Sequence, residues 1–101
     1  MDGNEYDELN GMFSKLMDLY DLAYEDIKRD VEYIILNGIR DEYIIEKLFD
    51  NVINIPTDKC YKLFVDLCAY VSRFNKGIVN DYIDVYKDLY GDNYKELNMT
   101  I

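Results

Sequence analysis

Apolar residues recur every three or four positions almost throughout this 101-residue chain, and this spacing is the strongest constraint on its fold. In an α-helix such positions share one face, whereas a strand requires alternation. Only one proline and five glycines interrupt the pattern. The chain is therefore expected to be all-α, a small single-domain bundle of about four helices.

The first expected helix is long. From residue 6 to residue 34 the apolar positions stay in phase within a band about 100° wide, as one continuous helix requires. We expect a single helix from about residue 5 to Leu36, about 45 Å long, ended by Asn37-Gly38. The alternative is two helices broken near residues 18–21, because an uncapped helix of this length is unusual in a small domain.

A short second helix should follow. Asp41 is an acceptable N-cap for a helix that continues through Val52 and stops at Ile55-Pro56. Thr57 then caps a third helix that runs to about Phe74. Its apolar residues cover about half of its circumference, which predicts the central helix of the bundle.

The last expected helix runs from about Ile78 to Tyr90, where Gly91 ends it. Residues 92–101 should form a frayed tail, with an extra turn at most over residues 94–97. No repeat or low-complexity linker divides the chain, so we expect one domain over residues 1–101.

Cys60 and Cys68 bear on the cellular compartment. On one helix their backbones would lie about 12 Å apart, too far for a disulfide. Free, buried thiols favour a reducing cytoplasm. The chain also shows no signal-peptide pattern and no apolar run of about 20 residues, so a cytoplasmic location without a membrane span is expected.

Composition argues against an enzyme. The chain has 11 tyrosines but no histidine, which removes the commonest catalytic base and metal ligand. It has no glycine-rich phosphate loop, and two cysteines are too few for a zinc site. We therefore expect no catalytic residues, no metal and no cofactor. A net charge of −10 disfavours direct binding of nucleic acid or anionic membranes and favours a basic protein partner.

The negative charge is concentrated near the start of the chain. Residues 1–32 hold ten acids and three bases, a net charge of −7, whereas the other 69 residues contribute only −3. One reading is ordinary solubilising charge; the other is a surface that binds a basic protein. The candidate partner-binding residues are Asp18, Asp21, Glu25, Asp26, Asp30 and Glu32.

Two further surfaces are secondary candidates. On the fourth helix a row of acids lies beside tyrosines, of which Tyr82 and Tyr86 should be mostly core while Tyr90 and Tyr94 should be freer. On the first helix three apolar residues fall outside the main band and predict a second packing surface. These secondary candidates are Asp81, Asp84, Asp88 and Tyr90, and Leu19, Leu22 and Tyr33.

The leading functional hypothesis is a stoichiometric inhibitor that occludes a basic, nucleic-acid-binding surface of a partner protein. Size, acidity and helicity are similar to those of phage-encoded anti-defence proteins, DNA-mimic proteins and immunity proteins that neutralise nuclease toxins, a likeness of composition without an aligned motif. An immunity protein is a close alternative. A different alternative is a structural or adaptor protein that forms a homodimer through Leu19, Leu22 and Tyr33.

Overall fold

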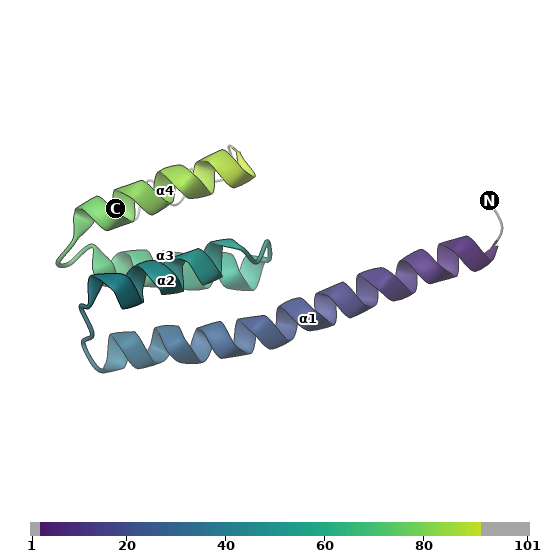
Figure 1. The fold of residues 1–101 in the computed structure, drawn as a ribbon, viewed down its shortest axis with the longest axis horizontal. Helices are drawn as coiled ribbons and strands as arrows, with labels where there is room; N and C mark the ends of the chain where they lie inside the picture. Colours follow the sequence, from purple (N-terminus) through teal and green to yellow (C-terminus); the bar gives the residue numbers. More distant parts are fainter. Residues whose placement is uncertain (1–2, 92–101) are drawn as a thin grey trace.

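The computed structural model describes residues 3–91, and this part of the chain is all-α. It contains four helices, namely α1 (Gly3–Leu36), α2 (Glu42–Ile53), α3 (Asp58–Val71) and α4 (Lys76–Tyr90). Figure 1 shows α2 and α3 beside the later half of α1, with α4 on their far side. The expected small helical bundle is therefore confirmed, and the expected turn over residues 94–97 lies outside the described residues.

Helix α1 is continuous through residues 18–21, so the alternative of two broken helices is wrong. It ends as the Asn37-Gly38 signal predicts. Gly38 has a φ of 63°, a left-handed conformation that a side chain would strain. The N–H groups of Gly38 and Ile39 donate to the carbonyl oxygens of Ile35 and Ile34, at 3.3 and 3.0 Å. This pair of bonds is the Schellman motif, which satisfies the last carbonyls of a helix.

Side-chain caps begin the three shorter helices. The Asp41 carboxylate accepts a 3.0 Å hydrogen bond from the N–H of Ile44, and the Thr57 hydroxyl accepts one of 3.3 Å from Cys60. Both caps are the predicted ones. The Asn75 side chain caps α4 in the same way, so this helix begins at Lys76, two residues before the predicted start.

Helix α3 is shorter than predicted, since it ends at Val71 instead of near Phe74. The Ser72 hydroxyl donates to the carbonyl of Ala69, and the N–H groups of Arg73 and Phe74 bond to carbonyls three residues back. These bonds tighten the last turn and replace α-helical geometry. The apolar side chain of Phe74 continues the periodic pattern, which is why the pattern overruns the helix.

The core is formed by buried side chains of all four helices, to which α1 contributes only from its later half. Helix α3 contacts the three others, as predicted, but so does α2. Phe49 of α2 and Phe64 of α3 are fully buried, with ring centroids 5.6 Å apart in an edge contact. Tyr82 and Tyr86 of α4 stack on these two rings, each at 4.6 Å. Cys60 and Cys68 are free and buried, as predicted.

Candidate protein-binding surfaces

The most prominent surface is the first part of α1, which extends beyond the bundle (Figure 1). We call residues 3–22 the arm. Apart from the half-buried Tyr20, its described apolar side chains are well exposed, from 41% at Leu16 to 67% at Met12 and Leu22. On the same helix Ile27, Val31 and Ile34 are buried. Within the apolar band of α1, the bundle therefore covers Ile27, Val31 and Ile34, whereas Leu16 on the arm is open to solvent.

The difference in helix length explains the open arm. Helix α1 has 34 residues, whereas α2, α3 and α4 have 12, 14 and 15. At 1.5 Å per residue, helices of about 20 Å lie beside one of about 50 Å and cover less than half of it. The molecule is accordingly elongated, with extents of 56, 29 and 19 Å. The arm thus offers apolar contact area that the described bundle does not use.

The six predicted partner-binding acids are all exposed on α1. By helical geometry Asp18, Asp21, Glu25 and Glu32 form a row on the α3 side of α1, away from its buried residues. The two others, Asp26 and Asp30, lie toward α2. The structure therefore leaves the predicted acidic face accessible, and we call the first four residues the acidic row.

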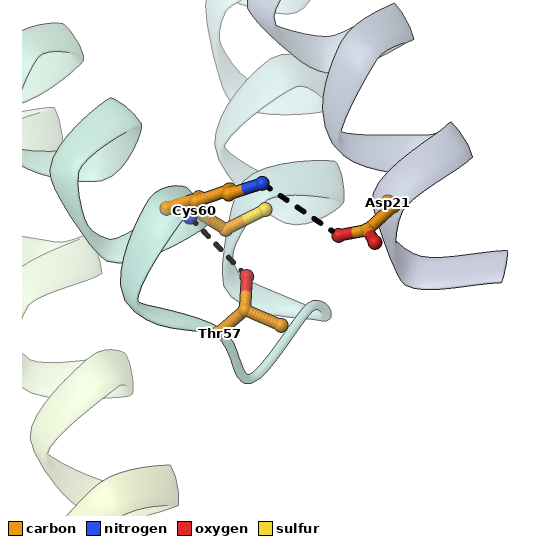
Figure 2. Close-up of polar contacts among 4 residues, drawn as sticks. Asp21, Thr57 and Cys60 are labelled. Atoms are coloured by element: carbon orange, nitrogen blue, oxygen red, sulfur yellow. Dashed lines mark hydrogen bonds and ion pairs between the residues drawn. The ribbon is translucent and has the colours of Figure 1, made fainter. Parts of the chain in front are cut away.

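Two of these acids contact cations. Asp21 lies 3.9 Å from the Lys59 ammonium at the start of α3, beside the turn that Thr57 caps (Figure 2). Asp26 lies 3.7 Å from the Arg29 guanidinium one turn along α1. All four side chains are well exposed, so these ion pairs contribute little to stability and leave the carboxylates available to a partner.

Sequence reasoning missed a group of cations beside the acidic row. A groove of about 490 Å³ between α1 and α3 is lined by Lys28, Lys59, Lys62 and Arg73, together with Glu32 and Asp66. In the sequence, Lys59, Lys62 and Arg73 follow one another at spacings of three and eleven residues, which would place them on one face of a continuing helix. Their position next to the acids of α1 depends on how the two helices pack. The acidic row therefore has a mixed-charge border on its α3 side.

The secondary candidates on α4 differ in environment. Asp81, Asp84 and Asp88 are exposed, as a binding row requires. The expectation that Tyr90 is freer is wrong, because its hydroxyl donates a 2.5 Å hydrogen bond to the Ile53 carbonyl and its ring lies 4.6 Å from that of Tyr86. Burial, followed by the neighbouring Tyr20 hydroxyl, raises the pKa of Tyr90. Its role is to close the end of the bundle.

Tyr82 and Tyr86 behave as predicted. Tyr86 is buried, and the hydroxyl of the partly buried Tyr82 contacts the Asp50 carboxylate at 2.9 Å and the Glu46 carbonyl at 3.1 Å. Burial and the bond to Asp50, with the nearby charges of Glu46 and Asp81, raise the pKa of Tyr82 well above its usual value. The hydroxyl therefore stays protonated and holds α4 on α2.

The off-band residues of α1 are exposed, as predicted: Leu19 by 62%, Leu22 by 67% and Tyr33 by 61%. Tyr33 also forms one wall of an apolar groove of about 320 Å³ between α1 and α2. The α2 side chains Tyr43 and Ile44 form the facing wall. This groove was not predicted, because the packing of α2 against α1 creates it.

The described residues supply no metal site and no membrane-crossing helix. Within residues 3–91 no three Cys, Asp or Glu side chains gather closely enough to hold an ion. None of the helices found there combines the length and the apolar composition that crossing a bilayer requires.

Comparison with known proteins gives no relative from which a function could be transferred: no family model, curated protein or solved structure matches this chain. The functional argument therefore depends on the geometry of these surfaces.

Proposed function

We propose that this chain is a stoichiometric binding protein that occludes a basic, nucleic-acid-binding surface of a partner protein. The observation that supports the proposal is the exposed arm of α1, which carries apolar side chains together with Asp18 and Asp21 of the acidic row, while Glu25 and Glu32 continue that row along the same helix. Exposed apolar residues with adjacent charges are typical of protein-binding surfaces.

The proposed mechanism has two stages. The negative charge of α1 attracts a cationic surface over a distance, which speeds the encounter and gives it a steep salt dependence. The apolar residues of the arm, such as Leu16 and Leu19, then lose their contact with water against the partner. Carboxylates fixed along a helix compete with phosphates for the same Arg and Lys side chains. The partner cannot hold nucleic acid while the arm is in place.

The test begins with capture of the partner from the native host or its invader on the immobilised full chain, with mass spectrometry of the retained protein. Affinity for the purified partner is then measured over a range of salt concentrations. The triple reversal of Asp21, Glu25 and Glu32 to Lys should abolish binding. It should leave helicity and melting temperature nearly unchanged, because each exposed charge contributes only tenths of a kcal/mol.

The matched control reverses Asp81, Asp84 and Asp88 on α4, which makes the same change in net charge on another helix. The control should weaken binding less. Equal affinity at low and high salt would contradict the proposal, as would indifference to both reversals. A stronger effect of the control would transfer the site to α4. A captured nuclease toxin would identify an immunity protein, and a captured defence protein would identify an anti-defence inhibitor.

A further inference from the structure

The apolar groove between α1 and α2 has no role in the proposed binding of a basic partner. Its rim carries Tyr33 from α1 and Tyr43 and Ile44 from α2, which are 61%, 67% and 45% exposed. Ile34, Ile39 and Leu48 form its apolar lining. Two tyrosines and an isoleucine around a hollow supply the contact area and shape typical of the centre of a protein interface.

The charges at this groove are balanced, unlike those of the whole chain. Asp30 lines it from α1 and Lys47 from α2, and both side chains are exposed. The Lys47 ammonium lies 5.6 Å from the centre of the Tyr43 ring, which holds the cation at the rim. Within the described part of the chain neither residue is in an ion pair. The groove therefore has one unpaired charge of each sign on opposite walls.

We propose that a second copy of this chain covers the groove as a two-fold symmetric dimer. In a two-fold interface every contact between two different residues occurs twice, once in each direction. Asp30 of one subunit would therefore pair with Lys47 of the other, and Lys47 of the first with Asp30 of the second. A basic partner would match a rim of carboxylates, whereas this rim carries equal and opposite charges. Local neutrality also spares this contact the repulsion that a net charge of −10 imposes elsewhere.

The dimer and the proposed inhibitory function are separable. On α1 the acidic row lies on the opposite side from the α2 groove, so it stays exposed when the groove is covered. The dimer would present two acidic rows, but a monomer could still bind a basic protein. Failure of one proposal therefore leaves the other standing.

The test is the oligomeric state of the full chain by sedimentation equilibrium at low salt. At tens of micromolar the wild type should approach twice the 12.0 kDa mass of one chain. Asp30→Lys and Lys47→Asp should each raise the dimer dissociation constant about tenfold or more, because each breaks both symmetric pairs and opposes like charges. The double variant Asp30→Lys with Lys47→Asp restores both pairs and should return the constant to within about threefold of wild type.

This design separates specific pairing from general repulsion. Asp30→Lys makes the chain less negative and Lys47→Asp makes it more negative, so a net-charge effect would move the two constants in opposite directions. Loss of the interface ion pairs would instead raise the dimer dissociation constant of both variants. The control Asp81→Lys makes the same charge change as Asp30→Lys but lies on α4, away from the groove, and should not weaken the dimer. Circular dichroism of each variant shows whether the fold is retained.

Several results would overturn the proposal. One is a strict monomer at tens of micromolar, which would leave the groove to a different protein. Another is a wild-type dimer that both single variants retain, or that the double variant fails to restore. A dimer that Leu22→Asp disperses while Asp30→Lys does not would move the interface to the arm.

Discussion

The hydroxyl of Tyr70, on α3, donates a 2.7 Å hydrogen bond to the carbonyl oxygen of Ile39, in the turn after α1. The bond ties together positions that are 31 residues apart in sequence. It fixes the connection between α1 and α2, and with it the Ile39 side chain that lines the α1–α2 groove.

Removing this hydroxyl should destabilise the fold. Tyr70→Phe leaves the partly buried Ile39 carbonyl without its donor, which costs about 1 kcal/mol. For a domain of this size the melting temperature should fall by about 4–8 °C. Thermal unfolding followed by circular dichroism measures the change. The control Tyr33→Phe removes an exposed hydroxyl and should change the melting temperature little; equal effects of the two variants would contradict the role assigned to Tyr70.

The two ends of α1 should respond differently to truncation of apolar side chains. Val31 is 1% exposed and Leu16 is 41% exposed. Val31→Ala removes two buried methyl groups and should cost about 2 kcal/mol. Leu16→Ala removes a larger group but should cost less than about 1 kcal/mol, because that group is half in water. Urea unfolding gives both values. A larger loss for Leu16→Ala would mean that the arm is covered.

Two glycines of the first helix and its turn should give opposite results when replaced by alanine. Gly38 has a φ of 63°, so Gly38→Ala should destabilise the protein by about 1 kcal/mol. At Gly11, within α1, an added Cβ meets nothing within 4 Å. Gly11→Ala should therefore stabilise the helical arm by about 0.5–1 kcal/mol.

Hydrogen exchange and thermal unfolding separate these two effects. Gly11→Ala should slow the exchange of arm amides with little change in melting temperature, since the arm lies outside the core. Gly38→Ala should lower the melting temperature. Destabilisation by Gly11→Ala would indicate that a neighbour approaches Gly11 closely.

Stability should fall in alkaline solution. Burial raises the pKa of the Cys68 thiol from 9.0 to about 12, so the folded state binds its proton more tightly than the unfolded chain does. The resulting stability is fully present below pH 9 and is lost as the pH rises from 9 to 12, because in that range the Cys68 thiol ionises in the unfolded chain but stays protonated in the folded one. At pH 10 the loss is about 1 kcal/mol. The raised pKa values of Tyr82 and Tyr90 act in the same direction.

Denaturant unfolding at several pH values between 7 and 10.5 follows this loss. Cys68→Ala is less stable at neutral pH because it leaves a cavity, but its alkaline decline should be shallower than that of the wild type. Parallel declines would show that Cys68 does not carry the effect.

The sequence alone determined the helices of this protein and most of their ends. Local signals suffice there: the phase of the apolar band makes α1 continuous, Asp41 and Thr57 cap the helices that follow them, and Gly38 ends α1. These signals act over one or two helical turns, so a single chain reveals them. The same periodicity also predicted that the six acids of α1 would be exposed.

Tertiary structure alone decided what the helices leave uncovered. The apolar residues of α1 follow the same spacing along the helix. However, α2, α3 and α4 are too short to cover all of α1, so Ile27 and Val31 are buried and Leu16 is open to solvent. Packing likewise places Lys59 beside Asp21 and draws Tyr90 into contact with the distant Ile53. Periodicity specifies which face of a helix is apolar, but burial depends on which other segment reaches that face, and such contacts form between residues far apart in the chain.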